Sequence, residues 1–199
     1  MPRKTFREIV DGLAGSRREL RGSVKLRAAL DAFDVRVEGR IALDVGASTG
    51  GFATVLLERG AAKVYAVDAG HGQLLGSLRQ DPRVVNLEAT NIADLTEELV
   101  PDAIDLFTVD VSYLPLRHAA TQLYRVRFAE GCEFVGLVKP MFELRLATAP
   151  TDPGVLQQAL TKAVDGITAA GWRVIDTMDS VRGAKGAPEF FVHARWESG

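Results

Sequence analysis

A glycine-rich turn flanked by acidic residues is the part of this sequence best suited to chemistry. The stretch Asp44-Val-Gly-Ala-Ser-Thr-Gly-Gly-Phe52 follows a short apolar run and opens onto a helical pattern, and a second apolar run, Lys63-Val-Tyr-Ala-Val-Asp68, ends in another acid. Glycine lets the backbone turn sharply and lets a ligand approach closely, because no Cβ intervenes. The second acid comes roughly 20 residues after the turn, where a Rossmann-type fold contacts a ribose hydroxyl pair. The pattern predicts an adenosine-containing cofactor at the carboxyl edge of a parallel sheet.

The spacing of the glycines distinguishes between two classes of cofactor. A dinucleotide pyrophosphate requires G-x-G-x-x-G at a helix N-terminus, whereas the glycines here are Gly46, Gly50 and Gly51. Asp44 would repel a pyrophosphate but suits a cation such as the ammonium of an amino-acid group. S-adenosylmethionine combines that ammonium with a sulfonium and a ribose. The turn therefore favours a methyltransferase over a nicotinamide-dependent dehydrogenase.

Composition limits the class of protein. The chain has 199 residues, 47% of them hydrophobic, which is enough for one domain with a sizeable core. The one cysteine, Cys132, excludes an internal disulfide and suits a reducing compartment. We find no apolar run near the ~20 residues that span a bilayer and no secretory signal. These features predict a cytoplasmic protein with no membrane partner.

The positive charges are concentrated near the N-terminus, although the net charge of the whole chain is −2. Residues 1–27 contain three acids and eight basic side chains: Arg3, Lys4, Arg7, Arg17, Arg18, Arg21, Lys25 and Arg27. A basic arm on an acidic body is typical of a polyanion-binding protein such as an RNA-binding enzyme. A solvated helix face explains the same charges, so both interpretations stay open.

Strand and helix patterns alternate along the chain. Apolar, often β-branched runs predict strands at about 40–46, 63–68, 83–88, 104–111, 132–139, 172–178 and 189–196, with helices at about 24–33, 51–59, 72–80, 115–126 and 154–170. Such alternation predicts an α/β fold with a mostly parallel, seven-stranded sheet and helices on both faces. We expect a basic arm over residues 1–20, one cofactor-binding domain over 21–199, and a long loop over 142–153 that covers a site.

Six motifs in succession resemble one known family. They are Asp44-Val-Gly-Ala-Ser-Thr-Gly-Gly-Phe52, Val67-Asp-Ala-Gly-His-Gly-Gln-Leu74, Leu78-Arg-Gln-Asp-Pro-Arg-Val84, Thr90-Asn-Ile92, Val109-Asp-Val-Ser-Tyr-Leu114 and Leu137-Val-Lys-Pro-Met-Phe-Glu143. Over roughly residues 20–196 the chain resembles the TlyA (haemolysin A) branch of the FtsJ-like ribose 2′-O-methyltransferases. The resemblance implies a Rossmann-like class I methyltransferase core that uses S-adenosylmethionine and modifies ribosomal RNA.

The resemblance also implies a catalytic tetrad of lysine, aspartate, lysine and glutamate. In this sequence it falls on Lys25, Asp110, Lys139 and Glu189. Lys139 would either remove the proton of the acceptor as a neutral amine or, as an ammonium oriented by Asp110, stabilise negative charge on the acceptor oxygen. Lys25 would contact the acceptor or its phosphate. The sequence does not decide between the two roles of Lys139.

The cofactor contacts that the resemblance implies extend beyond the acids and glycines of the turn. The methionine end would be lined by Asp44, Gly46, Ser48, Thr49, Gly50, Gly51 and Phe52, the ribose would bind Asp68, and the adenine would lie between Asn91 and Ile92. We expect no metal, because His118 and His193 lack the spacing of metal ligands.

Two departures from the family leave the methyl acceptor open. Members usually begin with an S4-type RNA-binding domain, whereas only about 20 residues precede the Lys25 motif here, and the loop over 142–153 has one arginine and no glycine. Phosphate contacts need several cations. The acceptor is therefore either ribosomal RNA held through the basic arm or a small molecule with a hydroxyl or amine. A non-enzymatic haemolysin or RNA-binding protein is the least favoured class, and the sequence does not give the oligomeric state.

Overall fold

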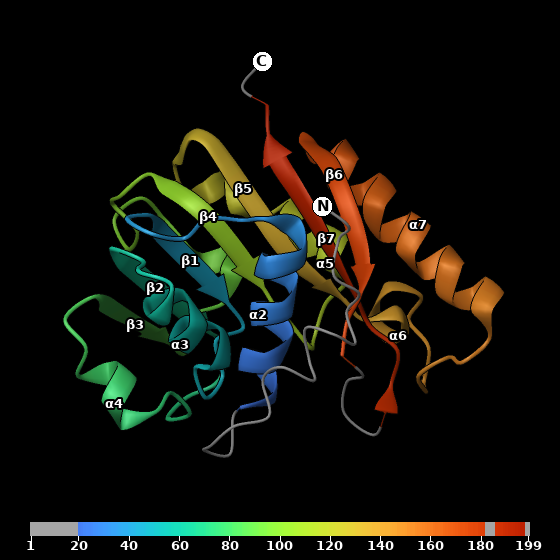
Figure 1. The fold of residues 1–199 in the computed structure, drawn as a ribbon, viewed down its shortest axis with the longest axis horizontal. Coiled ribbons are helices and arrows are strands. Elements are labelled where there is room, and N and C mark those ends of the chain that lie inside the picture. Colours follow the sequence, from blue (N-terminus) through green and yellow to red (C-terminus); the bar gives the residue numbers. More distant parts are fainter. Residues whose placement is uncertain (1–19, 182–185, 198–199) are drawn as a thin grey trace.

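The sheet of this protein contains seven strands and is parallel except for one of them. The computed structural model describes residues 20–181 and 186–197, so residues 1–19 of the predicted basic arm lie outside the described part. The strands are β1 (Ile41–Val45), β2 (Lys63–Asp68), β3 (Val84–Glu88), β4 (Ile104–Val109), β5 (Phe128–Val138), β6 (Trp172–Asp179) and β7 (Phe190–Trp196). Their order is β3-β2-β1-β4-β5-β7-β6, and β7 runs antiparallel to both of its neighbours (Figure 1). The predicted α/β fold is confirmed.

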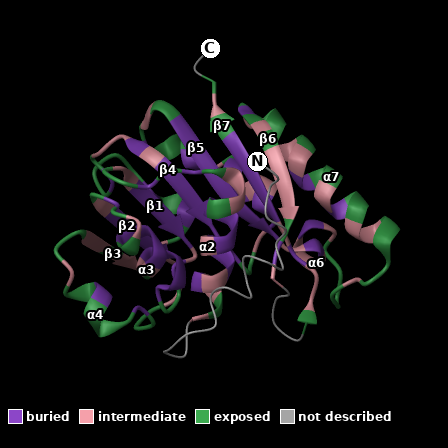
Figure 2. Ribbon diagram, viewed as in Figure 1, coloured by how far each residue is buried: buried purple, intermediate pink, exposed green. Residues whose placement is uncertain are grey.

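Helices cover both faces of the sheet because successive strand residues point to opposite faces. Leu43 and Tyr65 join one apolar cluster with residues of α5 (Leu116–Ala120) and α7 (Pro153–Ala169). Ala42 and Val64 join a second cluster with residues of α2 (Arg21–Phe33) and α3 (Gly51–Glu58). Figure 2 shows the central strands buried between these two layers. The near-continuous apolar runs of the sequence therefore reflect burial on both sides.

Several elements differ in length from the sequence-based expectation. The helix expected over 72–80 is reduced to α4 (Gly76–Arg79), and the one expected over 115–126 is split into α5 and the short 3-10 helix Leu123–Arg125. Gly72, with a φ of +71°, explains the first loss, because its backbone is left-handed. The strand expected over 132–139 starts earlier, at Phe128, and includes Gly131, whose φ is +69°.

The loop expected over 142–153 is partly helical. Helix α6 (Pro140–Glu143) starts directly after β5 with proline at its first position, where the missing N–H of proline is tolerated. A further 3-10 helix, Ile92–Asp94, follows β3. The carboxyl ends of β1, β2, β4 and β5 then meet at one edge of the sheet, which is where open parallel sheets bind ligands. In the described residues, no helix has the length and apolar character needed to cross a membrane.

Candidate active site

The turn between β1 and α3 requires glycine at two positions. Gly46 has a φ of +85°, and a Cβ there would lie 2.3 Å from the carbonyl oxygen of Asp110. Gly50 has a φ of +96°, and a Cβ there would lie 2.0 Å from a methyl group of Leu78. The amide of Gly46 also donates to the carbonyl of Val67 over 2.8 Å. These contacts fix the turn between the ends of β2 and β4. The backbone of Gly46 itself carries no side chain that would cover it.

Asp68 stabilises this turn. Its two carboxylate oxygens accept hydrogen bonds from the amides of Ser48 at 2.7 Å and Gly70 at 2.6 Å. The side chain remains half-buried at the end of β2, so lone pairs stay accessible from solvent. A ribose contact by Asp68 remains a prediction, and the carboxylate is already oriented for it by two backbone donors.

Asp44 lies behind the turn rather than in the wall of the pocket. Its side chain is fully buried, Oδ1 accepts a hydrogen bond from the hydroxyl of Thr108 at 2.8 Å, and Oδ2 has no partner. Burial raises the pKa of Asp44 to about 7, against the effect of the Thr108 hydrogen bond and together with the charge of Asp110. An unpaired buried carboxylate oxygen suits a cationic ligand, because desolvation is otherwise costly. Direct contact with an ammonium group remains a prediction.

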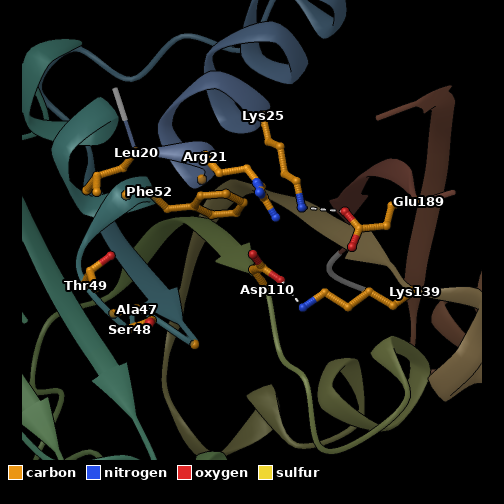
Figure 3. A pocket seen from close by; sticks show the side chains of 13 residues that line it. Leu20, Arg21, Lys25, Ala47, Ser48, Thr49, Phe52, Asp110, Lys139 and Glu189 are labelled. Atoms are coloured by element: carbon orange, nitrogen blue, oxygen red, sulfur yellow. Dashed lines mark hydrogen bonds and ion pairs between the residues drawn. The ribbon is translucent and has the colours of Figure 1, made fainter. Parts of the chain in front are cut away.

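The four residues of the predicted tetrad come together although they lie on four different segments. Lys25 on α2 forms an ion pair with Glu189 before β7, and Lys139 after β5 forms one with Asp110 after β4, with 2.5 Å between Nζ and Oδ1 (Figure 3). Lys139 also donates a hydrogen bond of 2.6 Å to the hydroxyl of Ser112. The arrangement alternates cations and anions around one point and holds the Lys139 amine between two oxygen atoms.

Close packing of α2 on α3 places Lys25 in this group. The hydroxyl of Ser23 donates to the carbonyl of Gly51 over 2.9 Å, and a Cβ on Gly51 would lie 3.1 Å from the Cα of Gly22. Small residues therefore let the two helices approach closely. The ring of Phe52, 6.2 Å from that of Phe191, fills the space beneath them.

A pocket of about 270 Å³ joins the turn to the tetrad. It is lined by Leu20, Arg21, Gly22, Lys25, Gly46, Ala47, Ser48, Thr49, Gly51, Phe52, Asp110, Lys139 and Glu189 (Figure 3). All four tetrad residues thus border the same space as five of the ten predicted cofactor residues, whereas Asp44, Gly50, Asp68, Asn91 and Ile92 do not line it. Gly46 and Gly51 border this space without side chains and the carboxylates of Asp110 and Glu189 face it, a lining that fits a ligand carrying an amino-acid cation.

Asn91 and Ile92 border a separate hollow of about 370 Å³, which is also lined by Ala93, Asp94, Tyr113, Leu114, His118 and Gln122. Asn91 is exposed, whereas the side chain of Ile92 is buried. An adenine contact at these two residues remains a prediction.

A third hollow, the acceptor-side pocket, adjoins the first and shares Lys139 and Glu189 with it. It measures about 460 Å³ and is lined mainly by apolar side chains: Ser112, Lys139, Pro140, Met141, Phe142, Ala147, Thr148, Ala149, Ala187, Pro188 and Glu189. Two ligands bound in the two pockets would meet at the tetrad. Ser112 and Phe142 were not predicted from the sequence, although Ser112 follows the end of β4 and Phe142 lies on α6, the helix that follows β5.

Metal ligands are not assembled in the described part of the chain, which contains no group of three histidine, cysteine, aspartate or glutamate residues able to hold an ion. His193 instead contacts Glu133 at 3.0 Å inside the protein, and its ring stacks on Phe33. Cys132 is buried, and burial raises the pKa of its thiol above the usual range.

Comparison with known proteins gives a consistent result. The family model described as FtsJ-like methyltransferase matches residues 19–196. The 16S/23S rRNA (cytidine-2′-O)-methyltransferase TlyA of Mycobacterium tuberculosis is 39% identical over 184 residues, covering 89% of this chain and 68% of the relative. Hemolysin A of Brachyspira hyodysenteriae is 37% identical over 181 residues, covering 87% of this chain and 75% of the relative.

Solved structures show the same fold. A hemolysin-like protein of Lactococcus lactis superposes with a TM-score of 0.85 at 32% identity, covering 91% of this chain and 90% of that one. Fibrillarin of Aeropyrum pernix, solved with bound S-adenosyl-L-methionine, superposes with a TM-score of 0.55 at 17% identity, covering 80% of this chain and 68% of that one. At that identity the likeness concerns the fold alone.

Proposed function

Since this chain belongs to the FtsJ-like methyltransferase family and uses S-adenosylmethionine, we propose that it methylates a ribose 2′-hydroxyl of ribosomal RNA through its lysine–aspartate–lysine–glutamate tetrad. The observation that carries the proposal is the pairing of Lys25 with Glu189 and of Lys139 with Asp110 between two adjoining pockets. The similarity to the 16S/23S rRNA (cytidine-2′-O)-methyltransferase TlyA of M. tuberculosis supports ribosomal RNA as the acceptor.

The reaction is an in-line displacement, for which positioning supplies much of the acceleration. The bound cofactor supplies a methyl group on a sulfonium; the oxygen–carbon bond forms as the sulfur–carbon bond breaks, and the hydroxyl proton must leave. Residues of the glycine turn and Asp68 would hold the donor, while the acceptor-side pocket would hold the nucleoside. Lys139 and Glu189 line both pockets, so we expect them to contact the reacting oxygen.

Lys139 is the central group of the proposed mechanism. The Asp110 carboxylate and the Ser112 hydroxyl hold its amine, and Lys139 borders both pockets. In that position the group either stabilises negative charge on the acceptor oxygen or takes its proton. The Lys25–Glu189 pair would orient the ribose from the opposite side. No metal is needed for either role of the tetrad.

A methyl-transfer assay tests the proposal. Wild-type protein and Lys139→Met would be incubated with labelled S-adenosylmethionine and, in parallel, with ribosomal subunits, free ribosomal RNA and a metabolite extract. We expect transfer to ribosomal RNA by the wild type, a loss of at least ~10²-fold in Lys139→Met, and unchanged cofactor binding by calorimetry. Lys63→Met, at the amino end of β2, is the matched control and should keep full activity.

Two results would contradict the proposal in different ways. Transfer only to a compound of the metabolite extract would replace RNA by a small-molecule acceptor and leave the tetrad intact. Full activity of Lys139→Met on RNA would instead reject the tetrad.

A further inference from the structure

A corner of three packed segments lies beside the acceptor-side pocket. The carboxylate of Glu143, at the end of α6, accepts a hydrogen bond from the amide of Leu116 at 2.5 Å and pairs with the guanidinium of Arg117 on α5. Gly166 of α7 lies against the same arginine, because a Cβ there would be 2.5 Å from the Cβ of Arg117. Segments that are far apart in the sequence are thereby fixed together.

Two exposed cations project from this corner. Arg145 follows α6 directly, and Lys162 lies one turn before Gly166 on α7. Both act on His118: burial, followed by the charges of Arg117, Arg145 and Lys162, lowers the pKa of His118. The carboxylate of Glu143, whose charge has the opposite effect on His118, pairs with Arg117. We call Arg145 and Lys162 the cationic surface.

Arg145 has a left-handed backbone, a conformation that favours glycine. Its φ is +54°, and it follows the last turn of α6, where Arg145 donates to the carbonyl of Phe142 over 3.3 Å and Leu146 donates to that of Met141 over 2.9 Å. Helices commonly end with glycine in this left-handed conformation, since a Cβ is disfavoured there. A long cationic side chain at such a strained position points to a function of that side chain.

The position of the cationic surface suggests what it binds. Ala147, two residues after Arg145, lines the acceptor-side pocket together with Lys139. A polyanion with one nucleotide at Lys139 would therefore extend near Arg145, and α7, which carries Lys162, packs against the preceding helix α6. We infer that the cationic surface binds the phosphate backbone of the RNA next to the methylated nucleotide, an inference that rests on the proposed RNA acceptor.

Salt dependence of RNA binding tests the inference. The probe is a fluorescently labelled single-stranded RNA, and its anisotropy is measured between ~50 and ~200 mM salt with the wild type, Arg145→Gly, Lys162→Gln and the double variant. The slope of log K against log salt is negative, and each lost phosphate contact should make it shallower by ~0.7. Each loss should also weaken binding about fivefold at ~0.1 M salt. In the double variant the slope should become shallower by about twice that amount.

Two controls distinguish the loss of a charge from a loss of protein stability. Arg145→Gly relieves the left-handed backbone, so its melting temperature should be no lower than that of the wild type while its RNA affinity falls. Arg36→Gln removes an exposed cation between α2 and β1, at the opposite edge of the sheet, and should leave the slope unchanged. Unchanged slopes in the double variant, with RNA still bound and methylated, overturn the inference alone. A wild type that neither binds nor methylates RNA overturns the proposed acceptor as well.

Discussion

Removing the carboxylate of Glu189 should destabilise the protein and, by a separable effect, abolish methyl transfer. Lys25 and Glu189 are 6% and 7% exposed, so each charge depends on the other for compensation. Removing one partner of a buried ion pair costs about 3–5 kcal/mol. Because this pair borders a pocket, we expect the lower value, ~3 kcal/mol. For a chain of 199 residues that corresponds to a fall in melting temperature of about 6–12 °C.

The two effects are separated by a double variant. Glu189→Leu leaves an unpaired lysine and should show the full loss of stability. Lys25→Met/Glu189→Leu replaces the pair by apolar side chains of similar volume, a change that is often neutral or stabilising. Its melting temperature should return to that of the wild type, whereas methyl transfer should stay absent because neither charge is present at the acceptor.

Circular dichroism melts and the methyl-transfer assay measure both quantities on the same samples. Arg59→Met is the control, since its pair with Asp31 is about one-third exposed on both sides and should contribute at most ~1 kcal/mol. A double variant that is as unstable as Glu189→Leu would refute the electrostatic reasoning. A double variant that still transfers methyl groups would refute the role of the pair in the reaction.

Three further predictions concern the glycine turn, the acid stability and the lysine partner. Gly46→Ala should cost at least ~2 kcal/mol of unfolding free energy and weaken cofactor binding, whereas Gly39→Ala, with a similar φ of +75° but nothing within 4 Å, should cost only ~1 kcal/mol in urea unfolding. Burial raises the pKa of Glu133 but hydrogen bonds from its histidine and arginine partners lower it overall, from 4.5 to about 2. The free energy of unfolding is therefore ~2 kcal/mol higher above pH ~4.5, and this gain is lost as the pH falls toward 2. Glu133→Gln should remove this dependence of stability on acid pH. If the variant and the wild type show the same dependence of stability on pH, the prediction is wrong. Ser112→Ala should lower kcat roughly tenfold with little change in KM, because the Lys139 amine loses one of its two anchors; a raised KM with normal kcat would argue for substrate binding instead.

The chemistry of the turn was predictable because it is local. Glycines at 46, 50 and 51 follow a buried strand within a few residues, and left-handed backbone at two of them is a property of residue type. Asp68 was predictable for the same reason, since an acid at the end of the second strand necessarily reaches the same edge of a parallel sheet. What the sequence pattern did not predict is that this carboxylate also caps Ser48 and Gly70.

Short helices and exposed loops were the poorly predicted parts. The helix expected over 72–80 is shortened to α4, where Gly72 has a left-handed backbone, and the one expected over 115–126 is broken into α5 and a 3-10 helix. The loop after Lys139 contains one arginine, and its sequence alone left the basic arm as the source of cations for RNA. Only the tertiary structure shows that α7, which carries Lys162, packs on α5 and α6.

By itself the sequence determined the alternating α/β architecture, the glycine turn and the family, since each depends on residue type and on spacing within one or two elements. Only the tertiary structure decided that Lys25 pairs with Glu189 across 164 residues, that Ser112 anchors Lys139, and that two pockets meet at the tetrad. These contacts depend on the order and direction of the strands, because the place of β7 between β5 and β6 brings Glu189 to the catalytic edge. Local periodicity records which face of an element is buried, but it does not record which distant element covers that face.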